Sequence, residues 1–197
     1  MFKKASVTAL SLMVLSSTAL AAVPQQSTGD DKASIGYSWH DFSVKDQGDD
    51  KVNGNEIYGS YKISDKFTVN AGYMTFNGDN YDNTYSSGDI QYKVNKNVSL
   101  LAGYGRYERE QLGTSFTRST AYGGLTLTSD LNNKVSGYAT GKFGNELTDW
   151  TVGLTYNINK DLLVDLNYRD IKANVKNDTT NFDAKADGVG LGLCYKF

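Results

Sequence analysis

The chain has 197 residues, and its 20 Lys and Arg against 22 Asp and Glu give a formal net charge of -2, without the basic excess typical of nucleic-acid binding. Its one cysteine, Cys194, excludes an intramolecular disulfide framework. No run of 18 apolar residues follows the N-terminal segment, which excludes transmembrane helices, whereas 20 glycines, 14 tyrosines and one proline favour strands and turns. A secreted β-sheet domain and a transmembrane β-barrel remain.

Residues 1–21 have the pattern of a cleavable secretory signal peptide. A basic start at Lys3 and Lys4, an apolar run from Ala5 to Leu15 and a small-residue cleavage site at 19–21 follow one another. The apolar run is shorter than the roughly 20 residues that cross a bilayer as a helix. We therefore predict a signal peptide at 1–21 and a single mature domain at 22–197.

Four similar units follow, and each has the pattern of a hairpin. The stretches YGSYKISDKFTVNAGY, IQYKVNKNVSLLAGY, LTLTSDLNNKVSGY and VGLTYNINKDLLVDLNY each place a short Ser/Asn/Asp/Lys turn between two alternating strands. Longer polar stretches separate these units at 45–55, 77–84, 108–115 and 172–187, with a brief one at 144–147. The pattern predicts short turns at one end of a sheet and longer loops at the other.

Ten strands are expected, at 33–44, 54–63, 67–76, 85–94, 98–108, 116–128, 134–143, 149–158, 162–172 and 185–197. Most are close to the 9–11 residues that cross a bilayer when tilted, and strands of soluble proteins are typically shorter. A barrel closes because lipid does not tolerate an unpaired edge. We predict an all-β, closed antiparallel up-and-down transmembrane β-barrel of about ten strands, with eight or twelve as alternatives.

Alternation assigns each side chain to the lipid or to the barrel interior. In strand 162–172, Leu166 and Tyr168 share an apolar face, and Asp165 and Arg169 share a polar one. The same reasoning predicts that the charged residues lining the lumen are Glu56, Lys62, Asp89, Lys93, Lys142, Asp165, Arg169 and Lys196. Outward aromatic residues near both strand ends predict two girdles at the membrane interfaces, formed by Trp39, Tyr61, Tyr73, Tyr92, Tyr104, Trp150, Tyr156 and Tyr168.

The chain ends on GVGLGLCYKF, an alternating strand with one large apolar face, one nearly bare face and a terminal aromatic residue. With the signal peptide and the repeated hairpins, this ending resembles the small outer-membrane β-barrel proteins of Gram-negative bacteria, the opacity-protein and OmpX-like porin-family barrels. The resemblance implies a place in the bacterial outer membrane and an assembly signal at Leu193, Tyr195 and Phe197. The implied partners are membrane lipids, lipopolysaccharide and the barrel-assembly machinery; we expect a monomer that binds no nucleic acid.

Signals for catalysis or metal binding are weak. His40 is the one histidine, and Asp41 beside it points to the opposite face of a strand, so these residues with Ser43 do not preassemble a catalytic triad. We expect an isolated histidine at the outer rim and an inward wall residue at Cys194. The acidic loops lack the spacing of a calcium-binding loop. We therefore expect no enzyme activity, no cofactor and no metal.

Two functions fit these features. Inward charges of both signs favour a narrow porin-like channel for ions or small solutes. The alternative is a closed structural or surface-interaction barrel, in which the same charges pair across the interior and the loops bind lipopolysaccharide or a host surface. Ten strands are close to the number at which side chains fill the interior, but width alone does not separate the two.

Overall fold

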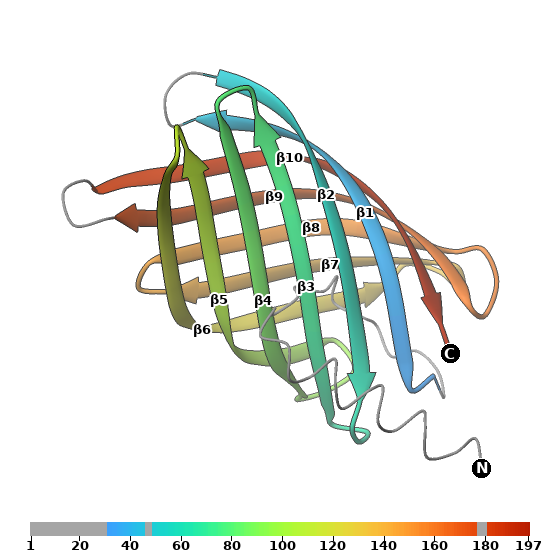
Figure 1. Cartoon of the computed structure of the whole chain (residues 1–197). Coiled ribbons are helices and arrows are strands. Elements are labelled where there is room, and N and C mark those ends of the chain that lie inside the picture. The colour runs from blue at the N-terminus through green and yellow to red at the C-terminus, as the bar shows by residue number, and fades with distance from the viewer. Residues whose placement is uncertain (1–30, 46–48, 177–180) are drawn as a thin grey trace, which may run out of the picture.

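A computed structural model of the chain describes residues 31–45, 49–176 and 181–197, without the side chains of residues 49, 175, 176, 181 and 182. It is a closed barrel of ten antiparallel strands (Figure 1), which confirms the predicted fold class and strand number. The signal peptide predicted at 1–21 lies outside the described residues. The strands are β1 (Ala33–Lys45), β2 (Asp49–Lys62), β3 (Phe67–Gly78), β4 (Tyr81–Lys93), β5 (Val98–Gln111), β6 (Thr114–Asp130), β7 (Val135–Gly144), β8 (Leu147–Asn157), β9 (Leu162–Lys176) and β10 (Asn181–Lys196).

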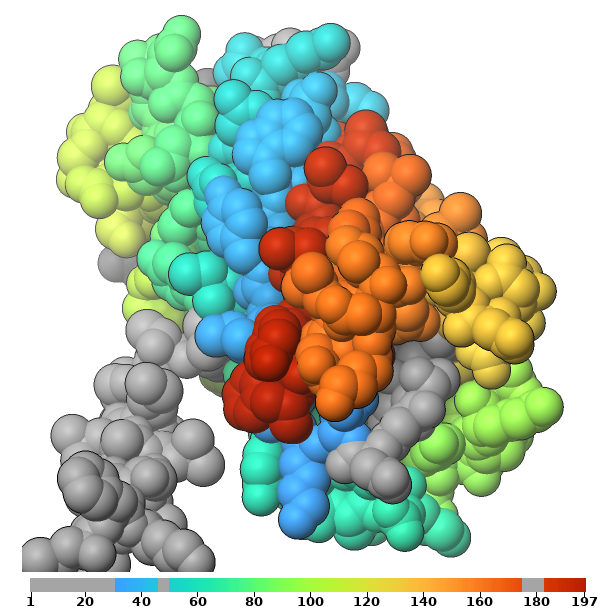
Figure 2. Space-filling view, turned by 90° about the vertical axis from the view of Figure 1, so that its right-hand side faces the viewer, coloured from blue at the N-terminus to red at the C-terminus, as the bar shows by residue number. Residues whose placement is uncertain are grey.

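Each strand pairs with its neighbours in the sequence, and β10 pairs with β1 to close the ring. Figure 2 shows β10, in red, between β1 and β9. The inward face of β10 carries glycines because larger side chains would clash there. A Cβ at Gly190 would lie 2.4 Å from Nδ1 of His40, and one at Gly192 would lie 2.4 Å from Oγ of Ser38. Glycine therefore makes room inside the barrel for the side chains of β1. In the described ranges, no helix is long and apolar enough to cross a membrane.

Four turns of the same construction join β2 to β3, β4 to β5, β6 to β7 and β8 to β9, at residues 63–66, 94–97, 131–134 and 158–161. The second residue of each turn is Ser64, Asn95, Asn132 or Asn159. Its side-chain oxygen accepts hydrogen bonds from the backbone N–H groups two and three residues further on, at 2.8–3.3 Å. Such local bonds explain why Ser and Asn recur at these positions. We call this end of the barrel the turn end.

The opposite end, which we call the loop end, differs from the prediction. Only two residues join β3 to β4, β5 to β6 and β7 to β8, so the polar stretches predicted as loops are strand for most of their length. The β5–β6 turn has φ of 50° at Leu112 and 75° at Gly113, the left-handed conformation that tight hairpins require at both central residues. The prediction of longer loops was wrong because Asp-, Asn- and Gly-rich segments pair with neighbouring strands in the ladder.

The side-chain pattern inverts between the two ends. In the turn-end half of β1, Tyr37 and Trp39 are exposed outside while Ser38 and His40 are buried inside. Towards the loop end, the buried inward residue is Phe42, and the outward positions are polar. Inward apolar residues from most strands form one cluster there, the apolar plug, made of Phe42, Val44, Val52, Met74, Phe76, Tyr81, Tyr85, Tyr107, Tyr122, Leu147, Ile171, Ala173, Ala184 and Ala186. The barrel interior is therefore polar in the turn-end half and mainly apolar in the loop-end half, where the buried polar residues Asn83 and Arg109 lie among the apolar side chains.

Candidate functional site in the barrel interior

Six of the eight residues predicted to line the lumen lie inside the barrel and are at most 5 % exposed: Glu56, Asp89, Lys142, Asp165, Arg169 and Lys196. The other two, Lys62 and Lys93, are half-buried near the turn end, where the Nζ of Lys62 lies 3.0 Å from Oδ1 of Asp65. Lys196 donates to the side-chain oxygen of Asn157 at 3.2 Å. The predicted residues thus separate into a group at mid-barrel and a group of lysines towards the turn end.

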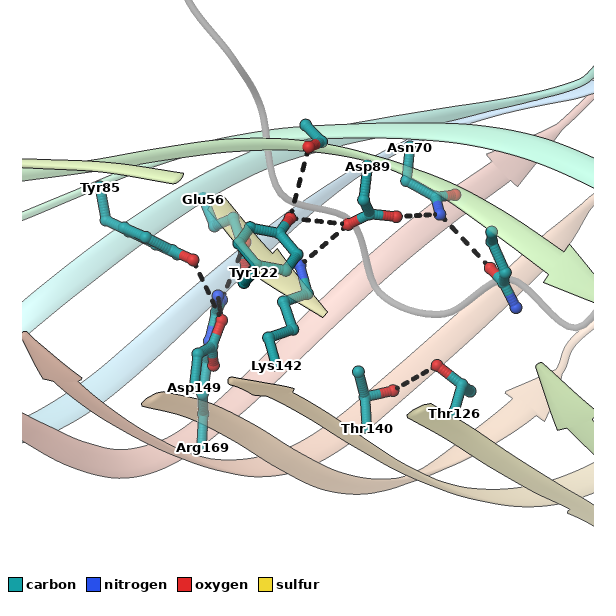
Figure 3. A network of polar contacts seen from close by, with 12 residues as sticks. Glu56, Asn70, Tyr85, Asp89, Tyr122, Thr126, Thr140, Lys142, Asp149 and Arg169 are labelled. Carbon is teal, nitrogen blue, oxygen red and sulfur yellow. Dashed lines mark hydrogen bonds and ion pairs between the residues drawn. The ribbon is translucent and has the colours of Figure 1, made fainter. Parts of the chain in front are cut away.

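Arg169 on β9 is the centre of the first group (Figure 3). Its Nε and Nη2 donate to the two carboxylate oxygens of Asp149 at 2.9 and 2.8 Å, and its Nη1 donates to Oε1 of Glu56 at 2.9 Å. The second oxygen of Glu56 lies 3.2 Å from Nε2 of His40. A guanidinium that forks onto one carboxylate and reaches another is held in a fixed orientation. Arg169 is therefore a fixed part of the interior.

Asp89 on β4 is the centre of a second group, also drawn in Figure 3. Its Oδ2 lies 3.2 Å from Nζ of Lys142 and accepts a hydrogen bond from Tyr122 at 3.0 Å. Its Oδ1 accepts a hydrogen bond from Nδ2 of Asn70 at 2.7 Å. Both oxygens of this buried carboxylate are thus satisfied by protein groups, as burial of a charge requires.

These contacts cross the lumen. Tyr85 on β4 donates to Asp149 on β8 at 3.4 Å, and the Arg169 guanidinium lies 5.6 Å from the centre of the Tyr85 ring. In the ring of ten strands, β4 and β9 are opposite each other. The two groups therefore form one layer across the barrel, the interior network, defined by Glu56, Asn70, Tyr85, Asp89, Tyr122, Lys142, Asp149 and Arg169. The prediction from sequence did not include Asp149, although it lies on the inward face of its strand with Thr151.

Asp165 does not belong to the interior network and is held by neutral hydrogen-bond donors. Its Oδ2 accepts hydrogen bonds from Tyr138 at 3.1 Å and from Asn167 at 2.5 Å. No lysine or arginine in the described part of the chain forms a salt bridge with it. Arg169, four residues along the same strand, is directed to Asp149 and Glu56 instead.

The prediction of a histidine at the outer rim was wrong. His40 is 1 % exposed, stacks on Phe42 with ring centres 5.0 Å apart, and contacts Glu56 in the interior. Asp41 is exposed on the outer face, so the two do not meet. The space that Gly190 leaves in β10 accommodates the histidine ring. Within the described ranges, no group of three or more His, Cys, Asp or Glu is arranged to hold a metal ion.

The predicted girdle residues all lie on outward positions of their strands. Trp39, Tyr61, Tyr104 and Tyr156 are exposed, and the other four are partly exposed. The rings of Trp150 and Tyr168 lie 5.5 Å apart on neighbouring strands. The proposed terminal signal also faces outward, with Leu193, Tyr195 and Phe197 all exposed. The roles of these residues as interface anchors and assembly signal stay predictions.

The comparisons with known proteins agree with this architecture. Residues 7–197 match the family model described as outer membrane protein beta-barrel domain. No curated protein matches the sequence.

Several solved structures are similar in fold. The outer membrane protease OmpT from Escherichia coli is 11 % identical, with a TM-score of 0.51 over 88 % of this chain and 100 % of OmpT. Neisserial surface protein A is 12 % identical, with a TM-score of 0.49 over 84 % of this chain and 97 % of the other. The KdgM porin, solved with disordered oligogalacturonate, is 15 % identical, with a TM-score of 0.45 over 83 % of this chain and 99 % of the porin chain. At such identities the likeness concerns the fold alone.

Proposed function

Because the chain belongs to the outer membrane β-barrel family, we propose that it is a closed barrel of the bacterial outer membrane, which works as a surface-interaction protein at its loop end. The observation that carries this proposal is the interior network, whose Arg169 binds carboxylates from two other strands. A hydrated ion would have to displace those bonds in order to pass.

The apolar plug supports the same conclusion from a second layer. It lies in the loop-end half of the barrel and meets the network at Tyr85 and Tyr122, which belong to both. Beyond them, Phe42, Val44, Met74 and Phe76 are at most 1 % exposed. An ion that passed the network would then meet packed aromatic and aliphatic side chains, and polar groups among them, such as the Tyr107 hydroxyl and the Asn83 amide, already bond to each other. Ten strands also give a lumen near the size that side chains fill, well below that of porins with 16 strands. These features therefore favour a closed barrel over a conducting channel.

The loop end has the features of a rigid binding surface. Strands β6, β9 and β10 have 17, 15 and 16 residues, more than the 9–11 that a tilted strand needs to cross the bilayer. Their extra length stays hydrogen-bonded to neighbouring strands, which keeps the projecting surface ordered. Outward positions there are polar and charged, such as Arg106, which lies two residues beyond Tyr104 and pairs with Glu108.

We propose lipopolysaccharide as the partner of this surface, since an outward arginine just beyond the aromatic girdle is placed to meet phosphate groups. We also propose that the protein is not an enzyme. Its one histidine is held by Glu56 inside the barrel, on the network side of Phe42, and Asp41 points away from it. The similarity to the protease OmpT concerns the fold and carries no activity to this chain.

Two measurements test the proposal. Liposomes that contain the purified barrel should swell no faster in small sugars or salts than protein-free liposomes, while a known porin gives rapid swelling. Rapid swelling with this barrel would favour the channel instead.

For the binding surface, Arg106→Gln should lower the amount of lipopolysaccharide that co-purifies with the barrel. Glu108→Gln breaks the same ion pair but removes the opposite charge, so it should retain or increase the bound amount. Equal losses in both variants would contradict a role for the arginine.

A further inference from the structure

The turn end carries an uneven distribution of charge. Each of its four turns contains one exposed lysine, and three further lysines lie beside them; together Lys32, Lys62, Lys66, Lys93, Lys96, Lys134 and Lys160 form what we call the lysine rim. The aspartates at this end are fewer, namely Asp31, Asp65, Asp130 and Asp161. Two of them form salt bridges to rim lysines, at 3.0 Å to Lys62 and 4.0 Å to Lys160. In the described part of the chain, Lys96 and Lys134 form no salt bridge.

An exposed apolar residue opens each of the same turns. Ile63, Val94, Leu131 and Ile158 are 46–61 % exposed and lie two or three residues before the turn lysine. Such a collar of exposed apolar side chains is suited to the edge of the hydrocarbon region. The rim lysines therefore lie at the depth of the lipid headgroups.

An aromatic contact fixes this depth for one lysine. The Nζ of Lys66 lies 5.9 Å from the centre of the Tyr92 ring, which packs against Phe67 with centres 5.1 Å apart. Aromatic residues of this kind occupy the membrane interface. The ammonium group is thus placed where phosphate groups of lipids lie, with its stem along the apolar surface.

The loop end contrasts with this arrangement, because several basic residues there pair with carboxylates. Lys45 lies 2.9 Å from Asp187, Arg118 lies 2.8 Å from Glu146, and Arg106 pairs with Glu108. The chain as a whole has a formal net charge of -2, so its overall charge does not attract anions. At the turn end, any attraction for anionic phospholipid must therefore come locally from the lysine rim.

We infer that the lysine rim binds anionic phospholipid headgroups of the leaflet at the turn end, with the ammonium groups on the phosphate and the apolar collar on the first acyl carbons. The four turns suit this role because side-chain hydrogen bonds from Ser64, Asn95, Asn132 and Asn159 fix their backbones. Juxtamembrane lysines attract anionic lipid in this way. The inference is independent of whether the lumen conducts.

The test counts phospholipids that stay bound to the full-length mature barrel in native mass spectrometry, from mixed micelles with equal amounts of phosphatidylglycerol and phosphatidylcholine. The wild-type barrel should retain phosphatidylglycerol preferentially. Lys96→Gln combined with Lys134→Gln should lower that preference by about fivefold for each lysine removed. The matched control combines Lys51→Gln with Lys172→Gln, two exposed lysines of the loop end, and should leave the preference unchanged.

Three results would overturn the inference: a wild-type barrel without preference, equal losses in the two double variants, or displacement of the lipid by soluble glycerol phosphate at the same phosphate concentration. The last result would indicate a simple anion site with no contribution from the collar. Far-ultraviolet circular dichroism of each variant checks that the barrel is folded, and the neutral substitutions lie on exposed turn or strand positions where folding tolerates them.

Discussion

The two halves of this barrel place opposite chemistry on the same ten strands. In the turn-end half, apolar side chains face outward and charged or polar ones face inward, as around Asp165 and Leu166. In the loop-end half, Ile171 is buried inside while its neighbour Lys172 is exposed outside. The difference follows from the surroundings: lipid requires an apolar exterior, whereas a strand that projects into water must bury its apolar residues inside.

The change of pattern occurs within single strands. In β1, the exposed apolar residues Ile35, Tyr37 and Trp39 have odd numbers, and the buried apolar residues Phe42 and Val44 have even ones. The alternation of inward and outward side chains continues unbroken along β1, but the apolar residues move from the outward to the inward positions near His40. A shift of this kind marks the level at which a transmembrane strand leaves the membrane.

The largest expected effect is in the interior network. Arg169→Gln should lower the free energy of unfolding by about 3–5 kcal/mol, because Asp149 and Glu56 would be left as buried charges without their cation. Urea denaturation of the refolded barrel measures this. Arg106→Gln removes an exposed ion pair at the loop end and should cost less than about 1 kcal/mol. If both variants lost the same amount, the network would be hydrated rather than buried.

A charge on the outer face of β9 tests where the membrane half ends. Leu166→Arg should destabilise the barrel by about 2–4 kcal/mol, since Leu166 faces the hydrocarbon. Asn174→Arg lies on the same face of the same strand at the loop end, and a surface change of this kind should stay within about 0.5 kcal/mol. Titration of both variants in urea gives the comparison. Similar losses would place Asn174 in the membrane and remove the distinction between the halves.

A smaller effect is expected from removing one methyl group. Ile171→Val in the apolar plug, where the residue is 1 % exposed, should cost about 0.5–1.5 kcal/mol. Ile57→Val on the outer face of the other half should cost less, because fluid lipid fills the space that a plug would leave empty. The urea concentrations at the unfolding midpoints of the two variants give the comparison. A larger loss for Ile57→Val than for Ile171→Val would mean that the plug is loosely packed.

The sequence predicted the membrane half well because its signals are local. Alternation around Leu166, the Asn-rich turns and the glycine-rich face of the last strand each follow from neighbouring residues. The parts of the strands that extend to the loop end were predicted as loops, because their Asp, Asn and Gly content is typical of loops and their pairing depends on distant segments. Val52 within the predicted 45–55 loop was an available signal, because it is an apolar residue in the same alternation as the inward Glu56 of the predicted strand 54–63.

The interior partners could be predicted only in part. The inward position of Glu56, Asp89 and Arg169 follows from alternation, but the choice of Asp149 as the partner of Arg169 depends on register across strands. The position of His40 was predicted wrongly for the same reason, because its burial depends on Glu56 of β2 and on the space at Gly190 of β10, which are its neighbours only through strand register.

Single-channel recording in planar bilayers tests the central claim most directly. With the interior network and the apolar plug in series, the wild-type barrel should insert without stepwise conductance at any applied voltage that the bilayer tolerates. Regular conductance steps, with an ion selectivity that shifts in Asp89→Asn, would contradict the closed barrel and establish a channel lined by these charges.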